Sequence, residues 1–192
     1  VYYALPSGHQ VFATAVVEQV VLVPGEAGWT GLAEPGATVN GTLERDGRAI
    51  AAADAVAGSD GRYRAALRGA DGDAVVPLPG DVLAVDEGRR RVEIAVPPLV
   101  AWRAAGSPPD GAVAGWSAPE RAVRAEHHAA DPLGRREVWV AGGRVDAWGA
   151  LFVRSVPIDP VASAAWLALI LPTGDEVRTP LAAQQGPPAR VH

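Results

Sequence analysis

The chain of 192 residues contains no cysteine, and this excludes disulfide bonds, thiol nucleophiles and thiolate metal sites together. It also contains no methionine, even at position 1, so we expect a processed product or a piece of a longer polypeptide, as removal of a signal peptide would leave. Lysine is absent too, and all positive charge comes from arginine, which we attribute to a GC-rich coding bias.

The net charge and the length of the longest apolar run exclude two classes of partner. The net charge is −5 and the pI is near 5.3, so the chain lacks the basic footprint that nucleic acid or an anionic membrane requires. The longest apolar run, 162–171, is about half as long as a membrane-spanning helix. We therefore expect no nucleic-acid partner and no membrane insertion.

Small residues and turn formers are abundant instead. Apolar residues make up 48% of the chain but aromatic residues only 6%, and there are 22 glycines and 17 prolines. This composition favours short strands joined by tight turns, around a core of small and β-branched side chains.

The apolar pattern agrees with an all-β fold. The β-branched run 11–23 is closed by proline and glycine and predicts a strand followed by a turn. In 38–44, apolar and polar residues alternate with period 2, which indicates a strand with one solvated face. Asp46-Gly47 and the run 59–61 have the composition of hairpin turns.

The second half of the chain repeats the first. At an offset of 84, Trp29, Gly31, Ala33, Pro35 and Val39 fall on Val113, Gly115, Ser117, Pro119 and Val123. At an offset of 88, Gly61, Tyr63 and Ala65 fall on Gly149, Leu151 and Val153, so we expect an inserted loop at 127–134. Self-similarity at this period predicts two copies of one small domain.

The repeats divide the chain into four segments. We place the boundary at Pro97-Pro98, a stiff, extended link between the last strand of one repeat and the first of the next. The segments are a 1–10 N-terminal extension, repeat one at 11–97, repeat two at 98–183, and a Pro-containing tail at 184–192. We also predict that Val39, Leu43, Tyr63, Leu67, Val123 and Leu151 are buried.

Three motifs in this order carry a family resemblance. They are G-x-A-x-P-G-A-x-V at Gly31 to Val39, x-D-G-x-Y at Ser59 to Tyr63, and a late L-P-G-D-x-V pattern, represented here by Leu78 to Val82. The chain resembles the tandem bacterial immunoglobulin-like and carboxypeptidase-regulatory-like β-sandwich repeats of secreted or cell-surface proteins. The resemblance implies two tandem immunoglobulin-like antiparallel β-sandwiches and an extracellular habitat; it implies no reaction.

Two clusters could in principle bind metal. His127-His128 lies near Glu126 and Asp131, and together these residues could bind a metal ion. Adjacent residues on a strand face opposite sides, however, so the competing interpretation is a solvated loop. His127 also aligns with the inward Leu43, which makes a half-buried histidine a further alternative. Acidic residues gather at 71–73, Asp81 and 86–87, where calcium binding and ordinary turn chemistry both account for them. The metal-binding residues therefore stay unknown.

No sequence feature points to an enzyme. The chain has no G-x-S-x-G elbow and no glycine-rich phosphate loop, so we predict no catalytic residue and no cofactor. Of the six tryptophans, Trp29 is expected in the core, whereas Trp102, Trp116, Trp139 and Trp148 are expected on exposed faces or interfaces. The sequon Asn40-Gly41-Thr42 is treated as coincidental.

These features favour a non-enzymatic extracellular structural or adhesive module, such as the subunit of a surface filament or S-layer that associates with itself or with neighbouring domains. The alternative is a carbohydrate-binding or substrate-presenting accessory module of a secreted enzyme, which a row of exposed tryptophans along one sheet would favour. The segment 1–5 is expected to form a strand without a sheet of its own, which would seek the edge of a neighbouring subunit.

Overall fold

The computed structural model describes the backbone of residues 2–4, 10–12, 18–104, 110–119, 121–130, 136–157 and 164–181. Side chains are described for 18–102, 112–119, 121–125, 140–153 and 165–181. Every regular element in these ranges is a β-strand, so the predicted all-β fold is confirmed. Accordingly, the described residues contain no helix long and apolar enough to cross a membrane.

The described residues form sixteen strands, and two of them form a separate hairpin at the N-terminus. The hairpin strands are β1 (Tyr2–Ala4) and β2 (Gln10–Phe12). The strands of the N-terminal half are β3 (Gln19–Leu22), β4 (Gly28–Leu32), β5 (Thr38–Arg45), β6 (Arg48–Val56), β7 (Arg62–Ala66), β8 (Val82–Asp86) and β9 (Arg91–Ala95). The strands of the C-terminal half are β10 (Val100–Ala104), β11 (Asp110–Trp116), β12 (Ala122–Ala130), β13 (Arg136–Arg144), β14 (Ala150–Pro157), β15 (Ala164–Ile170) and β16 (Glu176–Pro180).

The two halves have the same strand order. In each half the first, second and fifth strands are hydrogen-bonded neighbours, as β3-β4-β7 and β10-β11-β14. The remaining four strands pair in the order fourth, third, sixth, seventh, as β6-β5-β8-β9 and β13-β12-β15-β16. Residues aligned in the sequence repeat occupy equivalent strands: Val39 and Val123 lie on β5 and β12, and Tyr63 and Leu151 lie on β7 and β14.

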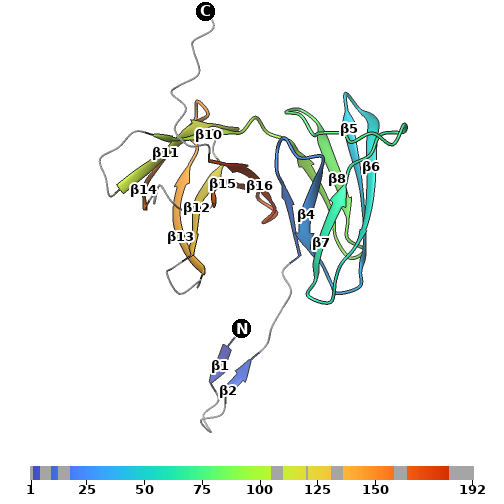
Figure 1. Cartoon of the computed structure of the whole chain (residues 1–192), viewed down its shortest axis with the longest axis horizontal. Coiled ribbons are helices and arrows are strands. Elements are labelled where there is room, and N and C mark those ends of the chain that lie inside the picture. The colour runs from blue at the N-terminus through green and yellow to red at the C-terminus, as the bar shows by residue number, and fades with distance from the viewer. Residues whose placement is uncertain are drawn as a thin grey trace, which may run out of the picture.

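One sheet continues from one half into the other. Strand β16 pairs in parallel with β3, in the register Glu176↔Val21 and Val177↔Leu22. The result is a seven-stranded sheet in the order β13-β12-β15-β16-β3-β4-β7. Figure 1 shows the two groups of strands side by side, with β16 on the side that faces the N-terminal half. The sequence did not predict this shared sheet. The link between the halves, Pro97-Pro98, lies between the end of β9 and the start of β10.

In the N-terminal half, the two sheets pack face to face, as in a β-sandwich. The ring of Trp29 on β4 lies over Gly41 on β5, where an added Cβ would come within 2.2 Å of the ring atom Cη2. Trp29 is buried, as predicted. All six residues predicted to be buried are confirmed in the core, namely Val39, Leu43, Tyr63, Leu67, Val123 and Leu151. The alternating pattern therefore gave the correct register.

Local turn chemistry also agrees with the prediction. The hairpin between β5 and β6 turns at Asp46-Gly47, with φ values of 50° and 73°. Two successive positive φ values are the signature of the tight turn that matches strand twist, and Asp-Gly is favoured there.

Three predictions about strands are wrong. The segment 1–5 does not lack a sheet, because β1 pairs with β2 in the register Tyr2↔Phe12. The run 11–23 is not one strand, since 11–12 belong to β2 and 19–22 belong to β3, which lie in different sheets. The expected loop at 127–134 begins later, because β12 continues through Ala130. The change of repeat offset from 84 to 88 predicted a loop there, but pairing with β13 and β15 extends the strand into the first part of that segment. The tail at 184–192 lies outside the described residues.

Candidate binding face and the junction between the halves

The outer face of the sheet β10-β11-β14 is apolar at every position with a described side chain. Its inner face is formed by buried residues such as Val113 and Leu151. The outward residues are Val100, Trp102, Ala112, Ala114, Trp116, Ala150 and Phe152, which we call the aromatic face. Antiparallel sheets with one solvated side normally carry polar residues there. An apolar outer face of this kind is typical of a binding surface.

The strand register brings three rings together on this face. Ala114 lies opposite Trp102 on β10 and opposite Phe152 on β14. Trp116, two residues further along β11, is therefore a diagonal neighbour of both rings, and such neighbours are roughly 7 Å apart. Trp116 is 54% exposed and Phe152 51% exposed, whereas Trp102 is half-buried. The alanines between the rings have short side chains, so no long side chain separates one ring from the next.

The other tryptophans lie elsewhere. Trp148 is 85% exposed, in the turn before β14, and its amide donates to the carboxylate of Asp146 at 2.9 Å. Trp166 on β15 is half-buried. The side chain of Trp139 lies outside the described residues. The prediction of exposed tryptophans is thus confirmed for Trp116 and Trp148.

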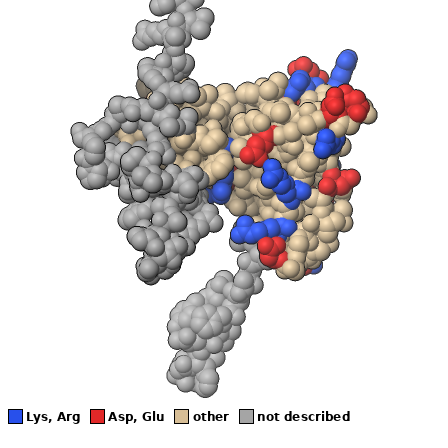
Figure 2. Space-filling model, viewed as in Figure 1, with Lys and Arg blue, Asp and Glu red and all other residues tan. Residues whose placement is uncertain are grey.

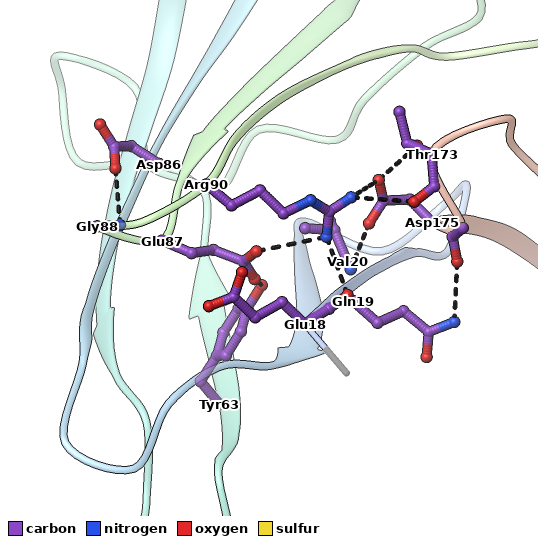
Figure 3. A network of polar contacts seen from close by, with 11 residues as sticks. Glu18, Gln19, Val20, Tyr63, Asp86, Glu87, Gly88, Arg90, Thr173 and Asp175 are labelled. Carbon is purple, nitrogen blue, oxygen red and sulfur yellow. Dashed lines mark hydrogen bonds and ion pairs between the residues drawn. The ribbon is translucent and has the colours of Figure 1, made fainter. Parts of the chain in front are cut away.

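A second distinctive feature is the junction where the turn between β15 and β16 meets the N-terminal half. Asp175 in this turn is fully buried and forms an ion pair with Arg90, which precedes β9. Its carboxylate also accepts hydrogen bonds from the backbone amide of Val20 at 2.8 Å and from the hydroxyl of Thr173 at 2.6 Å. Figure 3 shows the Arg90 side chain reaching across the junction to Asp175.

Arg90 is held from its own half as well. Its guanidinium donates to the backbone carbonyl of Glu18 at 3.0 Å and lies 3.6 Å from the carboxylate of Glu87, which is also buried (Figure 3). One arginine therefore stands between two buried carboxylates from different halves, the arrangement that buried charges require.

The pairing of β16 with β3 is reinforced by a second set of polar contacts. Gln19 on β3 donates to the carbonyl of Gly174 at 3.2 Å and to the carboxylate of Glu176 at 3.0 Å. Glu176 is buried and also pairs with Arg124 at 2.6 Å and with Arg178 at 2.7 Å. The backbone pairing, the hydrogen bonds of Gln19 and the Arg90–Asp175 ion pair thus cross from one half to the other, whereas both arginine partners of Glu176 belong to the C-terminal half.

Two carboxyl groups of the N-terminal half have shifted pKa values with different causes. Burial raises the pKa of Glu87 above its usual range, although the hydroxyl of Tyr63, which donates to it at 2.7 Å, acts in the opposite direction. Burial and the same contact raise the pKa of Tyr63. The guanidinium of Arg45, which donates two hydrogen bonds of 2.8 Å, lowers the pKa of Asp81.

The acidic residues considered for calcium have structural partners instead. Asp81 is engaged by Arg45. Asp71 accepts from the amide of Asp73 at 3.1 Å, and Asp86 accepts from the amide of Gly88 at 2.8 Å, as turn aspartates commonly do. Among the described side chains, no group of three or more histidine or acidic residues is placed to hold a metal ion.

The histidine cluster is placed only by its backbone. His127 and His128 lie on β12, opposite Trp139 and Val138 of β13. Their side chains lie outside the described residues, as do those of Glu126 and Asp131. The sequon residue Asn40 is exposed on β5.

A shallow groove of about 320 Å³ runs along the boundary between the halves. Ala95 and Pro97 line it from the N-terminal half, and Leu169 and Pro172 line it from the C-terminal half. On the face shown in Figure 2, arginine and acidic side chains are interspersed over the N-terminal half. Neither the groove nor this face carries a concentration of charges of one sign.

The junction residues were not identified from the sequence. Arg90, Asp175 and Glu176 lie in what looks like ordinary turn composition, within 86–91 and 173–176. The outward position of Trp116 was likewise not assigned to a particular sheet. The sequence offered one weak signal for the junction, which is the Asp175-Glu176 pair at the start of a strand, where an apolar residue would be usual.

Comparison with known proteins places the chain in no family, because neither a family model nor a curated protein matches it. Among solved structures, the chain is similar to trypsin activated alpha-2-macroglobulin from Escherichia coli. The sequence identity is 13% and the TM-score is 0.27, over 85% of this chain and 15% of that one. The chain thus spans a small part of that protein, and a similarity at this level supports no argument about function.

Proposed function

We propose that this chain is a non-enzymatic structural or adhesive module of the extracellular space or cell surface, built from two tandem immunoglobulin-like β-sandwiches. The repeated strand order of β3–β9 and β10–β16 supports two copies of one sandwich. The division of the chain at Pro97-Pro98 is part of this proposal, as is a role as the subunit of a surface filament or S-layer.

The observation that carries the proposal is the junction between the halves. Interfaces between domains of one chain are usually polar and permit relative motion. Here β16 continues the sheet of β3, and separation would remove Arg90 from Asp175 and Gln19 from Glu176. Unpairing a buried ion pair costs about 3 to 5 kcal/mol. The junction therefore supports a fixed angle between the two sandwiches, which a subunit under mechanical tension or in a regular repeat requires.

Backbone ¹⁵N relaxation of the whole chain tests this proposal. We expect residues of β4–β8 and of β11–β15 to report the same rotational correlation time, because one rigid body tumbles as a unit. Two different correlation times in the unaltered protein would contradict a rigid structural module. Negative-stain images of the protein test the filament specifically: polymers support it, and dispersed monomers overturn it.

A second candidate function is favoured by the aromatic face. An accessory module that binds carbohydrate for a secreted enzyme would need exposed rings along one sheet, and Trp116 and Phe152 lie exposed on β11 and β14. This function and the adhesive one both use the C-terminal sandwich for binding, and both use the junction to hold that sandwich in place.

A further inference from the structure

We propose that the aromatic face is a platform for a flat, uncharged polysaccharide. This proposal rests on the adhesive or accessory function proposed above and names its ligand class. It concerns the outer face of β10-β11-β14 alone, where Trp116 is a diagonal neighbour of both Trp102 and Phe152.

The chemistry of the face suits a sugar ring. A pyranose has one face of C–H groups, which is apolar and weakly positive, and an aromatic ring has a negative face on which such groups lie favourably. Successive sugars along a straight polysaccharide present such faces repeatedly. A sheet carrying several rings, with alanines between them, offers an even surface on which more than one sugar can lie.

The charge pattern points to a neutral ligand. The chain has a net charge of −5, and charged residues are interspersed on the visible face of its N-terminal half. The aromatic face has no charged residue among its described side chains, and the register places Arg154 of β14 opposite Ala112, in the row next to that of Phe152. A charged ligand lying over the rings would lose hydration without gaining an ion pair from the ring residues, whereas a neutral sugar keeps its outward hydroxyl groups in water.

The size of the face argues against a second copy of this chain as the occupant. Three strands about 4.8 Å apart, each contributing about five residues at 3.4 Å, cover roughly 240 Å². A stable protein interface buries about 800 Å² on each partner. The flat footprint of the aromatic face is about a third of that value, so a dimer would have to bury surface around the face as well, whereas a polysaccharide chain could lie along the face alone.

Depletion from solution by insoluble polysaccharide tests the proposal. The probes are microcrystalline cellulose and chitin, with carboxymethylated cellulose as the charged counterpart. The variants are Trp116→Ser and Phe152→Ser on the face, with Trp148→Ser as the matched control, since Trp148 is 85% exposed but lies outside the face. Thermal unfolding confirms that each variant is folded, and sedimentation reports its oligomeric state.

We expect the full chain to bind at least one neutral probe more tightly than the charged one. Each face variant should bind about tenfold more weakly, whereas Trp148→Ser should bind like the unaltered chain. The proposal is overturned if no neutral probe is bound, or if Trp116→Ser and Phe152→Ser bind as tightly as the control. A dimer that Phe152→Ser dissociates would also overturn it, in favour of a second copy as occupant. A failure of this kind leaves the relaxation result intact, so the two proposals fail separately.

Discussion

Removal of the arginine at the junction is the sharpest perturbation that the structure offers. Arg90→Met keeps an apolar stem of similar reach but deletes the guanidinium that bridges Asp175 and the carbonyl of Glu18. The adjacent Arg89 provides a matched control, because it pairs with Glu34 at 3.3 Å while 76% of its side chain is exposed. Arg90 is 21% exposed, and Asp175 is fully buried.

The expected cost follows from what remains around Asp175. Breaking a buried ion pair by removing one partner typically costs about 3 to 5 kcal/mol. Asp175 would keep the donors from Val20 and Thr173, and water reaches part of the Arg90 side chain, so we expect about 3 kcal/mol for Arg90→Met. Arg89→Met removes an exposed pair and should cost less than about 0.5 kcal/mol.

Urea unfolding of the two variants measures the difference, and a double-mutant cycle with Asp175→Asn isolates the pair. The asparagine keeps an oxygen that accepts from Val20 but has no charge, so Arg90→Met should cost about 1 to 3 kcal/mol less in that background. If Arg90→Met costs no more than Arg89→Met, or costs the same with and without Asp175, the ion pair does not hold the junction and our reasoning is wrong.

Two further predictions concern the N-terminal half. Gly41→Ala should lower the free energy of unfolding by about 1 to 3 kcal/mol, because its Cβ would meet the buried ring of Trp29 at 2.2 Å. Gly142→Ala in the C-terminal half is the control and should have little effect, because the nearest atom to its added Cβ is 4.0 Å away. Equal costs in urea unfolding would contradict this account. Because burial raises the folded pKa of Glu87, the folded state binds its proton more readily than the unfolded state, and this contribution stabilises the fold as the pH falls through the raised pKa. As the pH falls from neutral toward the ordinary glutamate pKa of about 4.3, the unaltered chain should therefore gain more stability than Glu87→Gln, whereas exposed Glu93→Gln should follow the unaltered chain. Parallel curves for Glu87→Gln and the unaltered chain would refute this account.

Much of the fold could be predicted because its signals are local. The alternation around Val39 and Leu43 follows from the two-residue period of a strand, and it identified which side chains are buried. Asp46-Gly47 indicated its turn because few residue pairs adopt two positive φ values. The repeat of these signals at an offset of 84 to 88 placed Val123 and Leu151 on the equivalent strands.

The candidate sites could not be predicted in the same way, because they depend on which strands become neighbours. Trp102, Trp116 and Phe152 form one face only after β10, β11 and β14 pair in a particular register, and the local pattern of each strand does not specify its partner. Arg90 and Asp175 are 85 residues apart, and no local preference distinguishes them from other turn residues. The sequence by itself therefore determined the strands, their turns and their inward residues. Only the tertiary structure decided the junction and the aromatic face, since both arise from long-range pairing that brings together side chains from separate strands.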